Sequence, residues 1–457
     1  MARRAAPHAA HGDGRRDRAR GDGGRDGAHG APGGSRTLAE LVQDCVHCGF
    51  CLPSCPTYVL TGEEADSPRG RIHLVGQVLA GTPIAGTPQL HLDRCLSCMA
   101  CVTACPSGVR YDEIVEIARG RVAVEGVRGR ADRLRRWAIF ALFPHPRRLR
   151  AARVALLAAD RSGLRQILRR PGVARRLPDL VRTLDALAPA LTAVEDIPTF
   201  LPGTEPSRGR VGLLTGCVQS VLFSEVNAAT ARVLAAEGFD VVVPAGQGCC
   251  GALSSHAGRE REAAEMARRT VDCFAAAGVD TVVVNAAGCG SAMKEYARLL
   301  RDDPRYAQPA AELAARTRDF SELLAAAGTR APRGRLDLAV AYHDACHLAH
   351  AQGIRDAPRA LLEEIPGLEL REIAEPDLCC GSAGVYNLLE IDTARELGAR
   401  KAAGVAATGA DVLVAANPGC LMQIRAAADP GSAPMTYSHV AEVLDASLRA
   451  AGHGRST

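Results

Sequence analysis

Eight of the 17 cysteines in this 457-residue chain form two copies of one motif near the N-terminus. The copies are Cys45-x2-Cys48-x2-Cys51-x3-Cys55-Pro56 and Cys95-x2-Cys98-x2-Cys101-x3-Cys105-Pro106. Three thiolates at this spacing can bind three irons of a cubane cluster, while the fourth, which precedes a proline, ligates the other cluster. We therefore expect two [4Fe–4S] clusters. The first would be bound by Cys45, Cys48, Cys51 and Cys105, and the second by Cys95, Cys98, Cys101 and Cys55.

Zinc is the alternative metal, because zinc sites also use Cys-x2-Cys pairs. Zinc ribbons need neither a third cysteine nor a repeated Cys-Pro, so the spacing favours the clusters. With a protein thiolate at every corner, neither cluster offers an open iron to a substrate. The motif therefore predicts an electron relay rather than a catalytic centre. Nearby apolar side chains are candidates to shield the clusters or to form ordinary core: Val46, Leu52, Leu96, Met99 and Val102.

Eight further cysteines form two groups of four later in the chain: Cys217, Cys249, Cys250 and Cys289, then Cys346, Cys379, Cys380 and Cys420. In each group a Cys-Cys-Gly (CCG) sequence follows the first cysteine, after 31 and 32 intervening residues. Each set of four thiols could bind a further iron–sulfur cluster. Redox-active thiols and small buried hydrophobic residues in tight turns remain alternatives.

The last cysteine, Cys273, stands alone in a predicted helix and is expected in the core. His343 and His347 flank Cys346. Ligation, proton transfer and a hydrogen-bonded structural role all remain open for these two histidines.

Strands and helices alternate beyond Arg208, which predicts α/β structure with at least some parallel pairing. The predicted strands are 211–214, 241–243, 281–284 and 412–414, and the predicted helices are 225–237 and 259–277. The CCG cysteines fall at strand or loop ends, and their order and spacing repeat. The sequence thus contains an internal repeat. The expected fold class is mixed, with a small α-helical ferredoxin-type domain followed by two α/β CCG domains.

Composition divides the chain into five stretches. Residues 1–36 hold nine Gly and eight Arg with almost no large apolar side chains, which predicts a disordered tail. Residues 128–182 hold sixteen Arg against three Asp, with apolar residues at helical spacing. The predicted domains are 1–36 (tail), 37–125 (ferredoxin-type), 126–205 (Arg-rich helical linker), 206–335 (first CCG repeat) and 336–452 (second CCG repeat).

The net charge of +4 is too small to indicate a nucleic-acid partner. No apolar run is long enough to span a bilayer, and no apolar signal-peptide core is present, so we expect a cytoplasmic protein. The Arg-rich segment, with Trp137 to Phe143, allows two interpretations. It is either a solvated or partner-facing linker, or a segment lying on the anionic inner face of the plasma membrane, near the quinone pool.

The doubled ferredoxin motif, joined to two CCG repeats, resembles the iron–sulfur subunit of glycolate oxidase (glycolate dehydrogenase) over about residues 38–450. The matching segments include Thr215-Gly-Cys-Val-Gln219, Gly248-Cys-Cys-Gly251 and Cys379-Cys-Gly-Ser-Ala-Gly384. The repeats alone are also similar to those of heterodisulfide reductase, anaerobic glycerol-3-phosphate dehydrogenase and lactate-utilisation proteins. Heterodisulfide reductase ends each repeat with Cys-x2-Cys, whereas Ala292 and Gln423 replace the second cysteine here.

The resemblance implies a complex in which FAD-containing subunits oxidise glycolate to glyoxylate. This chain would pass the electrons toward a quinone or another acceptor, and would itself contain no catalytic residue. No flavin site is obvious in the sequence, which agrees with flavin chemistry in a partner. The alternatives are the iron–sulfur subunit of another flavin dehydrogenase, acting on D-lactate or glycerol 3-phosphate, or a heterodisulfide-reductase-like thiol/disulfide catalyst.

Overall fold

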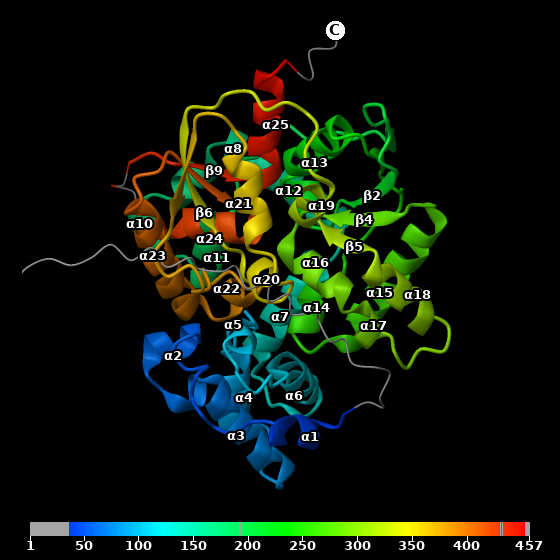
Figure 1. Ribbon diagram of the computed structural model, residues 1–457. Helices are drawn as coiled ribbons and strands as arrows, with labels where there is room; N and C mark the ends of the chain where they lie inside the picture. The colour runs from blue at the N-terminus through cyan, green and yellow to red at the C-terminus, as the bar shows by residue number, and fades with distance from the viewer. Residues whose placement is uncertain (1–35, 192, 430, 432, 453–457) are drawn as a thin grey trace, which may run out of the picture. The chain divides into compact units, whose positions relative to one another are not determined.

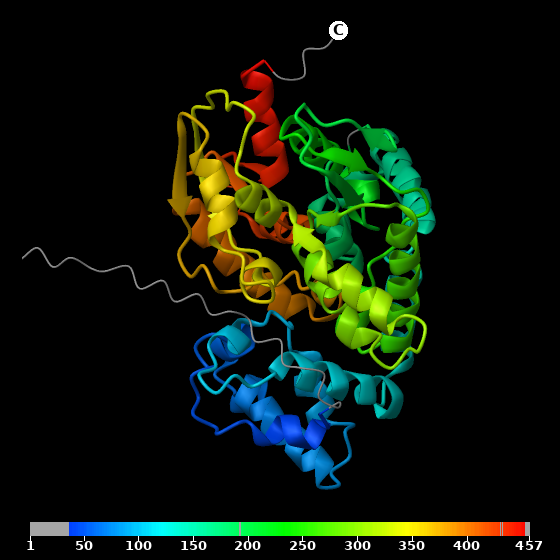
Figure 2. The ribbon, with the colours of Figure 1, turned by 45° about the vertical axis from the view of Figure 1, so that its right-hand side comes forward.

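The computed structural model describes residues 36–191, 193–429, 431 and 433–452. The predicted tail, apart from Arg36, lies outside the described residues. The chain from Leu38 onward forms one compact unit. Figures 1 and 2 show in it a helical N-terminal region, in blue and cyan, and two α/β regions, in green and in yellow to red. The predicted mixed fold class is therefore confirmed.

The helical region packs short helices around the loops that carry the ferredoxin-motif cysteines. Its core includes Leu41, Ile114 and Val115, which are almost fully buried, together with Cys95 and Cys101. The packing of these helices thus fixes the ends of the loops that carry the ferredoxin-motif cysteines. The elements are α1 (Leu38–Gln43), α2 (Pro56–Thr61), the 3-10 helix η1 (Glu64–Asp66), α3 (Pro68–Leu79), α4 (Thr87–Asp93), α5 (Ala100–Thr103) and α6 (Tyr111–Glu125).

The Arg-rich segment is helical, as predicted, and it packs against the second α/β region. Ile139, Phe140 and Leu187 are buried against Val385 and Leu388. Many of the arginines in this segment form ion pairs with aspartates. The helices are α7 (Arg130–Leu142), α8 (Pro146–Arg161), α9 (Leu164–Leu168), α10 (Pro171–Ala174) and α11 (Asp179–Leu187).

The first α/β region contains a sheet in the order β1-β3-β2-β4-β5, in which only the edge strand β1 is antiparallel to its neighbour. The strands are β1 (Phe200–Leu201), β2 (Arg210–Leu214), β3 (Asp240–Val242), β4 (Thr281–Val284) and β5 (Thr317–Asp319). The helices are α12 (Gln219–Leu222), α13 (Ser224–Ala236), α14 (Ala252–His256), α15 (Glu260–Ala276), α16 (Ala287–Lys294), α17 (Tyr296–Leu299), α18 (Ala307–Ala315) and α19 (Phe320–Ala327).

The second α/β region repeats the arrangement with a fully parallel sheet in the order β7-β6-β8-β9. The strands are β6 (Leu338–His343), β7 (Leu368–Glu372), β8 (Val412–Ala415) and β9 (Thr436–His439). The helices are α20 (Cys346–Ala349), α21 (Asp356–Glu363), α22 (Tyr386–Leu389), α23 (Ile391–Ala406), α24 (Pro418–Ala427) and α25 (Val440–Ala450).

The two α/β regions share one hydrophobic core, which includes Leu213 and Val283 from the first and Val340 and Leu413 from the second. A buried polar contact also joins them, because His439 at the start of α25 hydrogen-bonds the carbonyl of Asn285 at 2.8 Å. The repeats therefore hold each other in a fixed orientation.

Candidate functional site

Two loops with matching backbone conformation carry the ferredoxin-motif cysteines. In the first loop His47 and Gly49 have positive φ, and in the second loop Ser97 and Met99 have positive φ at the equivalent positions. Alternation of right- and left-handed residues turns successive N–H groups inward, which suits a negatively charged cluster. Three of these four residues are not glycine, so a strained conformation is maintained at a candidate functional site.

The ferredoxin-motif cysteines line two cavities. Cys45, Cys48, Cys51 and Cys105, called the first site below, line one cavity together with Val46 and Phe50. Cys55, Cys95, Cys98 and Cys101, called the second site, line the other, and Cys101 borders both. In both cavities the fourth cysteine comes from the other motif copy. The donor set and the loop conformation thus fit two cubane clusters.

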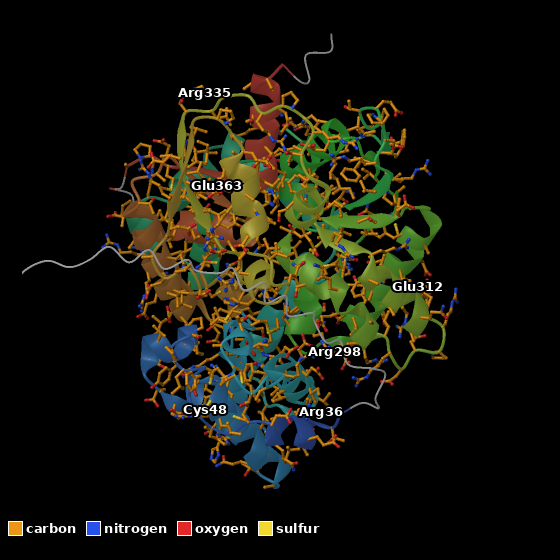
Figure 3. The ribbon with its side chains drawn as sticks, in the orientation of Figure 1. Arg36, Cys48, Arg298, Glu312, Arg335 and Glu363 are labelled. Carbon is orange, nitrogen blue, oxygen red and sulfur yellow. The ribbon has the colours of Figure 1, made fainter. Side chains whose placement is uncertain are left out.

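The two sites differ in exposure. Cys48 is exposed (Figure 3), and Val46 and Phe50 are 68% and 66% exposed. All four cysteines of the second site are buried. The first site therefore opens to the surface, while the second lies inside the protein.

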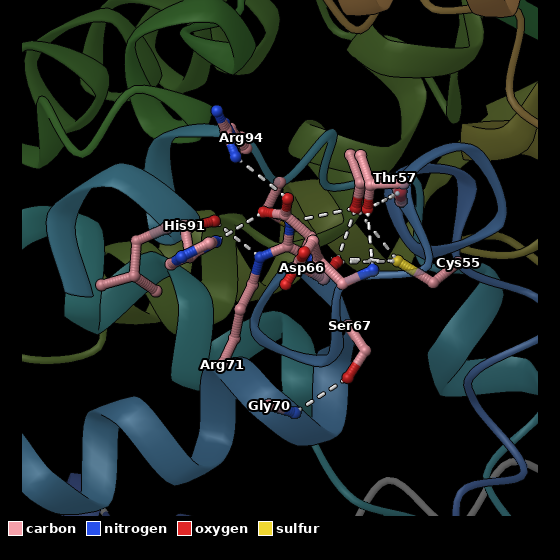
Figure 4. Close-up of polar contacts among 12 residues, drawn as sticks. Cys55, Thr57, Asp66, Ser67, Gly70, Arg71, His91 and Arg94 are labelled. Carbon is pink, nitrogen blue, oxygen red and sulfur yellow. Dashed lines mark hydrogen bonds and ion pairs between the residues drawn. The ribbon is translucent and has the colours of Figure 1, made fainter. Parts of the chain in front are cut away.

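A buried polar network supports the second site (Figure 4). Arg71, fully buried on α3, donates to the carbonyl of His91 at 2.6 Å, to Thr57 Oγ1 at 3.0 Å and to Cys55 Sγ at 3.8 Å. Asp66, also fully buried, lies 3.6 Å from Arg71 and accepts from His91 and Arg94. The network places positive charge beside the thiols.

Arg119 on α6 holds the second loop from the other side. It donates to the carbonyls of Leu92 and Cys95 and to Ser97 Oγ. Burial raises the pKa of Cys98 and of Cys101. At Cys95 burial acts in the same direction, but the charges of Arg71 and Arg119 outweigh it and lower the pKa below its ordinary value. These arginines favour the thiolate, which is the form that binds iron.

The CCG cysteines of each repeat come together beyond the carboxyl ends of three parallel strands. In the first repeat they follow β2, β3 and β4, and in the second repeat they follow β6, β7 and β8. Cys217 Sγ lies 3.5 Å from Cys249 Sγ, and Cys346 Sγ lies 3.6 Å from Cys379 Sγ. In each sheet the strands that follow β2 or β6 in the chain are added on both sides of that strand. Ligands of such sheets bind at this switch point.

The two CCG groups face a shared cavity of about 490 Å³, which the Arg-rich helices help to enclose. Its lining includes Cys250 and Cys420 from the two repeats, with Leu149 and Leu187 from the Arg-rich helices. The volume is in the range of small-molecule sites.

A histidine pair lies at the border of that cavity. His256 Nε2 of the first repeat and His347 Nε2 of the second are 3.1 Å apart. Burial, with the proximity of His347, lowers the pKa of His256 well below its ordinary value. The pair therefore joins the two repeats through a direct contact between their side chains.

The second site lies directly against the second CCG group. Cys98 and Leu96 belong to one buried cluster with Cys346, Cys379 and Tyr386. The Tyr386 hydroxyl donates to the carbonyl of Arg94 at 3.1 Å, which ties α22 to the ferredoxin region. Thiols of the ferredoxin region and of the second repeat thus share one buried apolar cluster.

Some individual expectations were wrong. Val46 borders the first site but is largely exposed, whereas Leu96 and Met99 are buried, as expected for shielding residues. Cys273 is only partly buried on α15, so it does not belong to the core. Sequence reasoning missed Arg71, Arg119 and His256, because an isolated Arg or His carries no spacing signal.

No helix among the described residues is long and apolar enough to cross a membrane.

Three protein families match the chain. The 4Fe-4S dicluster domain matches residues 44–109, which implies two [4Fe–4S] clusters, as predicted. The cysteine-rich domain matches residues 211–294 and again 340–425. The linker region of the glycolate oxidase iron-sulfur subunit matches residues 131–188, where the Arg-rich helices lie.

Known proteins are similar to this chain over most of its length or over about half of it. The chain is 38% identical to the probable glycolate oxidase iron-sulfur subunit of Bacillus subtilis, over 90% of this chain and 95% of that protein. It is 36% identical to the glycolate oxidase iron-sulfur subunit of Escherichia coli, over 85% and 91%. Lactate utilization protein A of Bacillus licheniformis is 32% identical but matches only 52% of this chain. With both ferredoxin motifs, the linker helices and both CCG repeats present, the chain belongs to the family of glycolate oxidase iron–sulfur subunits.

Proposed function

We propose that this chain is the electron-transfer subunit of a glycolate-oxidising complex. FAD-containing partner subunits would oxidise glycolate to glyoxylate, and the chain would carry the electrons toward a quinone or another acceptor. Membership of the family supports the proposal. So does the donor set, since eight cysteine thiolates at two sites leave no iron open to a substrate.

The proposed ligands are the eight ferredoxin-motif cysteines. Cys45, Cys48, Cys51 and Cys105 hold one cluster, and Cys95, Cys98, Cys101 and Cys55 hold the other. The linings of the two cavities support this assignment. When bound, the clusters accept and donate one electron at a time. The protein orients them through the two loops, and Arg71 and Arg119 offset the negative charge of the buried thiolates.

One observation supports a direction for electron transfer through the chain. The first site opens to the surface at Cys48, while Cys98 of the second site shares a buried cluster with Cys346 and Cys379. Electrons would enter at the exposed site and leave through the buried one toward the second repeat. The eight CCG cysteines are proposed as ligands of further metal centres on this route.

The proposed domain division keeps the predicted boundaries, with a ferredoxin-type domain at 37–125, a linker at 126–205 and CCG repeats at 206–335 and 336–452. Strands β2 and β6 begin at Arg210 and Leu338, a few residues inside the two CCG boundaries, whereas the edge strand β1 of the first sheet lies within the proposed linker.

The proposed location is the cytoplasm, and the membrane-surface interpretation of the Arg-rich helices is directly testable. Trp137 is 66% exposed and stands among arginines. The full chain is sedimented with anionic vesicles at low salt, and Trp137→Ser serves as the comparison. Binding that this variant weakens supports membrane association, and no binding removes that interpretation.

The decisive test of function is anaerobic purification of the tagged chain from its native cell. We expect a brown protein that carries a flavoprotein and reduces an electron acceptor with glycolate. A complex that uses D-lactate or glycerol 3-phosphate instead would place the chain in a different dehydrogenase. A chain without any flavoprotein partner would contradict the proposal.

The shared cavity favours a second candidate, a thiol/disulfide catalyst. Its substrate would contact Cys250 or Cys380, which both line the cavity. Against it, Ala292 and Gln423 replace the additional thiols, and Gln423 Nε2 is committed to the carbonyl of Ala394 at 2.7 Å. Disulfide reduction abolished by Cys380→Ala, with the ferredoxin clusters intact, would support this candidate.

A further inference from the structure

The two CCG repeats are equivalent residue by residue where their sheets end. In the first repeat Leu214 is the last residue of β2 and pairs with Val284 of β4. In the second repeat His343 is the last residue of β6 and pairs with Ala415 of β8. Each stands three positions before the first cysteine of its group, and its partner stands five positions before the last. His343 therefore occupies the position that Leu214 occupies in the first repeat.

The surroundings of these two residues differ in polarity. Leu214 is buried in an apolar cluster with Cys250, and Cys289 packs against that cluster. His343 is 1% exposed, and neither of its ring nitrogens has a hydrogen-bond partner. A buried polar group without a partner destabilises the fold. Leu214 is apolar and needs no polar partner at its position. The His343 imidazole needs one and has none.

Two thiols lie close to the unpartnered ring of His343. A ring nitrogen of His343 and the sulfurs of Cys380 and Cys420 all lie within 4.8 Å of one another. Cys346 and Cys379 of the same group are 3.6 Å apart. Two thiolates on one tetrahedral ion, with metal–sulfur bonds of about 2.3 Å, lie roughly 3.8 Å apart. Imidazole and thiolate together suit iron or zinc.

We infer that His343 is a nitrogen ligand of a metal centre in the second repeat, bound together with Cys380 and Cys420, and that the first repeat offers thiolates alone. The inference extends the proposed function, in which the CCG cysteines hold further centres. An imidazole in place of a thiolate removes a negative charge and raises the reduction potential of an iron–sulfur centre. The second repeat, which contacts the ferredoxin region through Cys346, would then draw electrons away from it.

The test uses the full chain, purified anaerobically with ¹⁴N- or ¹⁵N-histidine. Pulsed EPR of the iron centres, oxidised and reduced, is recorded for the wild type, His343→Leu, His343→Gln and His347→Gln. His343→Leu introduces the residue that the first repeat uses at this position. His347→Gln is the matched control, because His347 adjoins Cys346 but hydrogen-bonds His256.

We expect a strong coupling to a histidine nitrogen in the wild type and in His347→Gln, and its loss in both His343 variants. If elemental analysis finds zinc in the second repeat, the same proteins are compared at the zinc K edge. There a nitrogen neighbour near 2.0 Å should be lost only in the His343 variants. If His343 had only a structural role, His343→Gln would leave the signals of the metal unchanged.

A centre whose metal content and spectra are unchanged in His343→Leu overturns the inference. So does a wild-type chain with no metal in the second repeat. Both results leave the ferredoxin clusters and their reduction by glycolate untouched, so the inference can fail while the proposed function stands. The ferredoxin signals also report whether each variant has folded.

Discussion

The first and second sites share one cysteine spacing and the same left-handed loop positions, but their surroundings are opposite. Around the first site, Cys48 and Phe50 are exposed, and the nearest arginine on α3, Arg69, pairs with Glu64 at the surface. Around the second site, the cysteines are buried beside Arg71 and Arg119. Equal ligand sets in unequal environments can bind similar clusters that differ in access and in potential.

The largest expected effect follows from removing one ligand at each site. Cys48→Ala and Cys98→Ala should each lower electron transfer from glycolate to the acceptor by about 100-fold or more, because loss of a ligand exceeds the 10–100-fold effect of supporting residues. The two variants should fail at different steps. In Cys98→Ala the partner should still reduce the first cluster, whereas in Cys48→Ala it should not reduce the second. EPR after anaerobic addition of glycolate separates these outcomes, and reduction of the second cluster in Cys48→Ala would reverse the proposed order.

The next effect compares two arginines of α3. Arg71→Leu leaves buried Asp66 with fewer partners and should cost about 3 kcal/mol of unfolding free energy. Arg69→Leu breaks a surface pair with Glu64 and should cost less than about 1 kcal/mol. Anaerobic denaturant titration measures both. Equal losses would show that burial does not distinguish the two sites.

We expect the cluster at the more exposed site to be lost first. A chelator with a mild oxidant should bleach the visible absorbance in two phases, with the first site emptied before the second. Cys48→Ala, which lacks the first cluster, should show only the slow phase. A single phase in the wild type would contradict the difference in access.

The smallest effect concerns Phe50. Phe50→Ser should change stability by less than about 0.5 kcal/mol, because its side chain is largely in solvent. Leu96→Ser, beside the second site, should cost about 2–4 kcal/mol, because Leu96 is buried. Thermal unfolding of the anaerobic proteins gives both values. A large loss of stability in Phe50→Ser would show that the Phe50 side chain is covered by other residues even without a partner subunit.

Much of this arrangement could be predicted from the sequence. The strand at 281–284 was predicted with the bounds that β4 has, and the helix at 259–277 is α15 with one residue fewer at each end. A long segment with periodic apolar residues that ends at a glycine gives a clear signal for a helix or a strand. Strands β1, β5, β6, β7 and β9 were not predicted, and the two-residue strand β1 has no period to detect.

Contacts between distant segments were harder to predict. The apolar residues of 128–182 predicted helices, but not that Leu149 and Leu187 would help to enclose the cavity of the CCG cysteines. Val46 and Leu96 occupy equivalent motif positions, so the sequence could not tell which one would be buried. That choice is made by the second repeat, which covers Leu96 and leaves Val46 in solvent.

The central claim is tested most directly by the iron and acid-labile sulfide of the anaerobically purified full chain, with EPR of the reduced protein. The account predicts two cubane clusters in the wild type, and one each in Cys48→Ala and Cys98→Ala, with the first and the second cluster missing respectively. Zinc in place of iron, an absence of sulfide, or loss of the same cluster in both variants would contradict it.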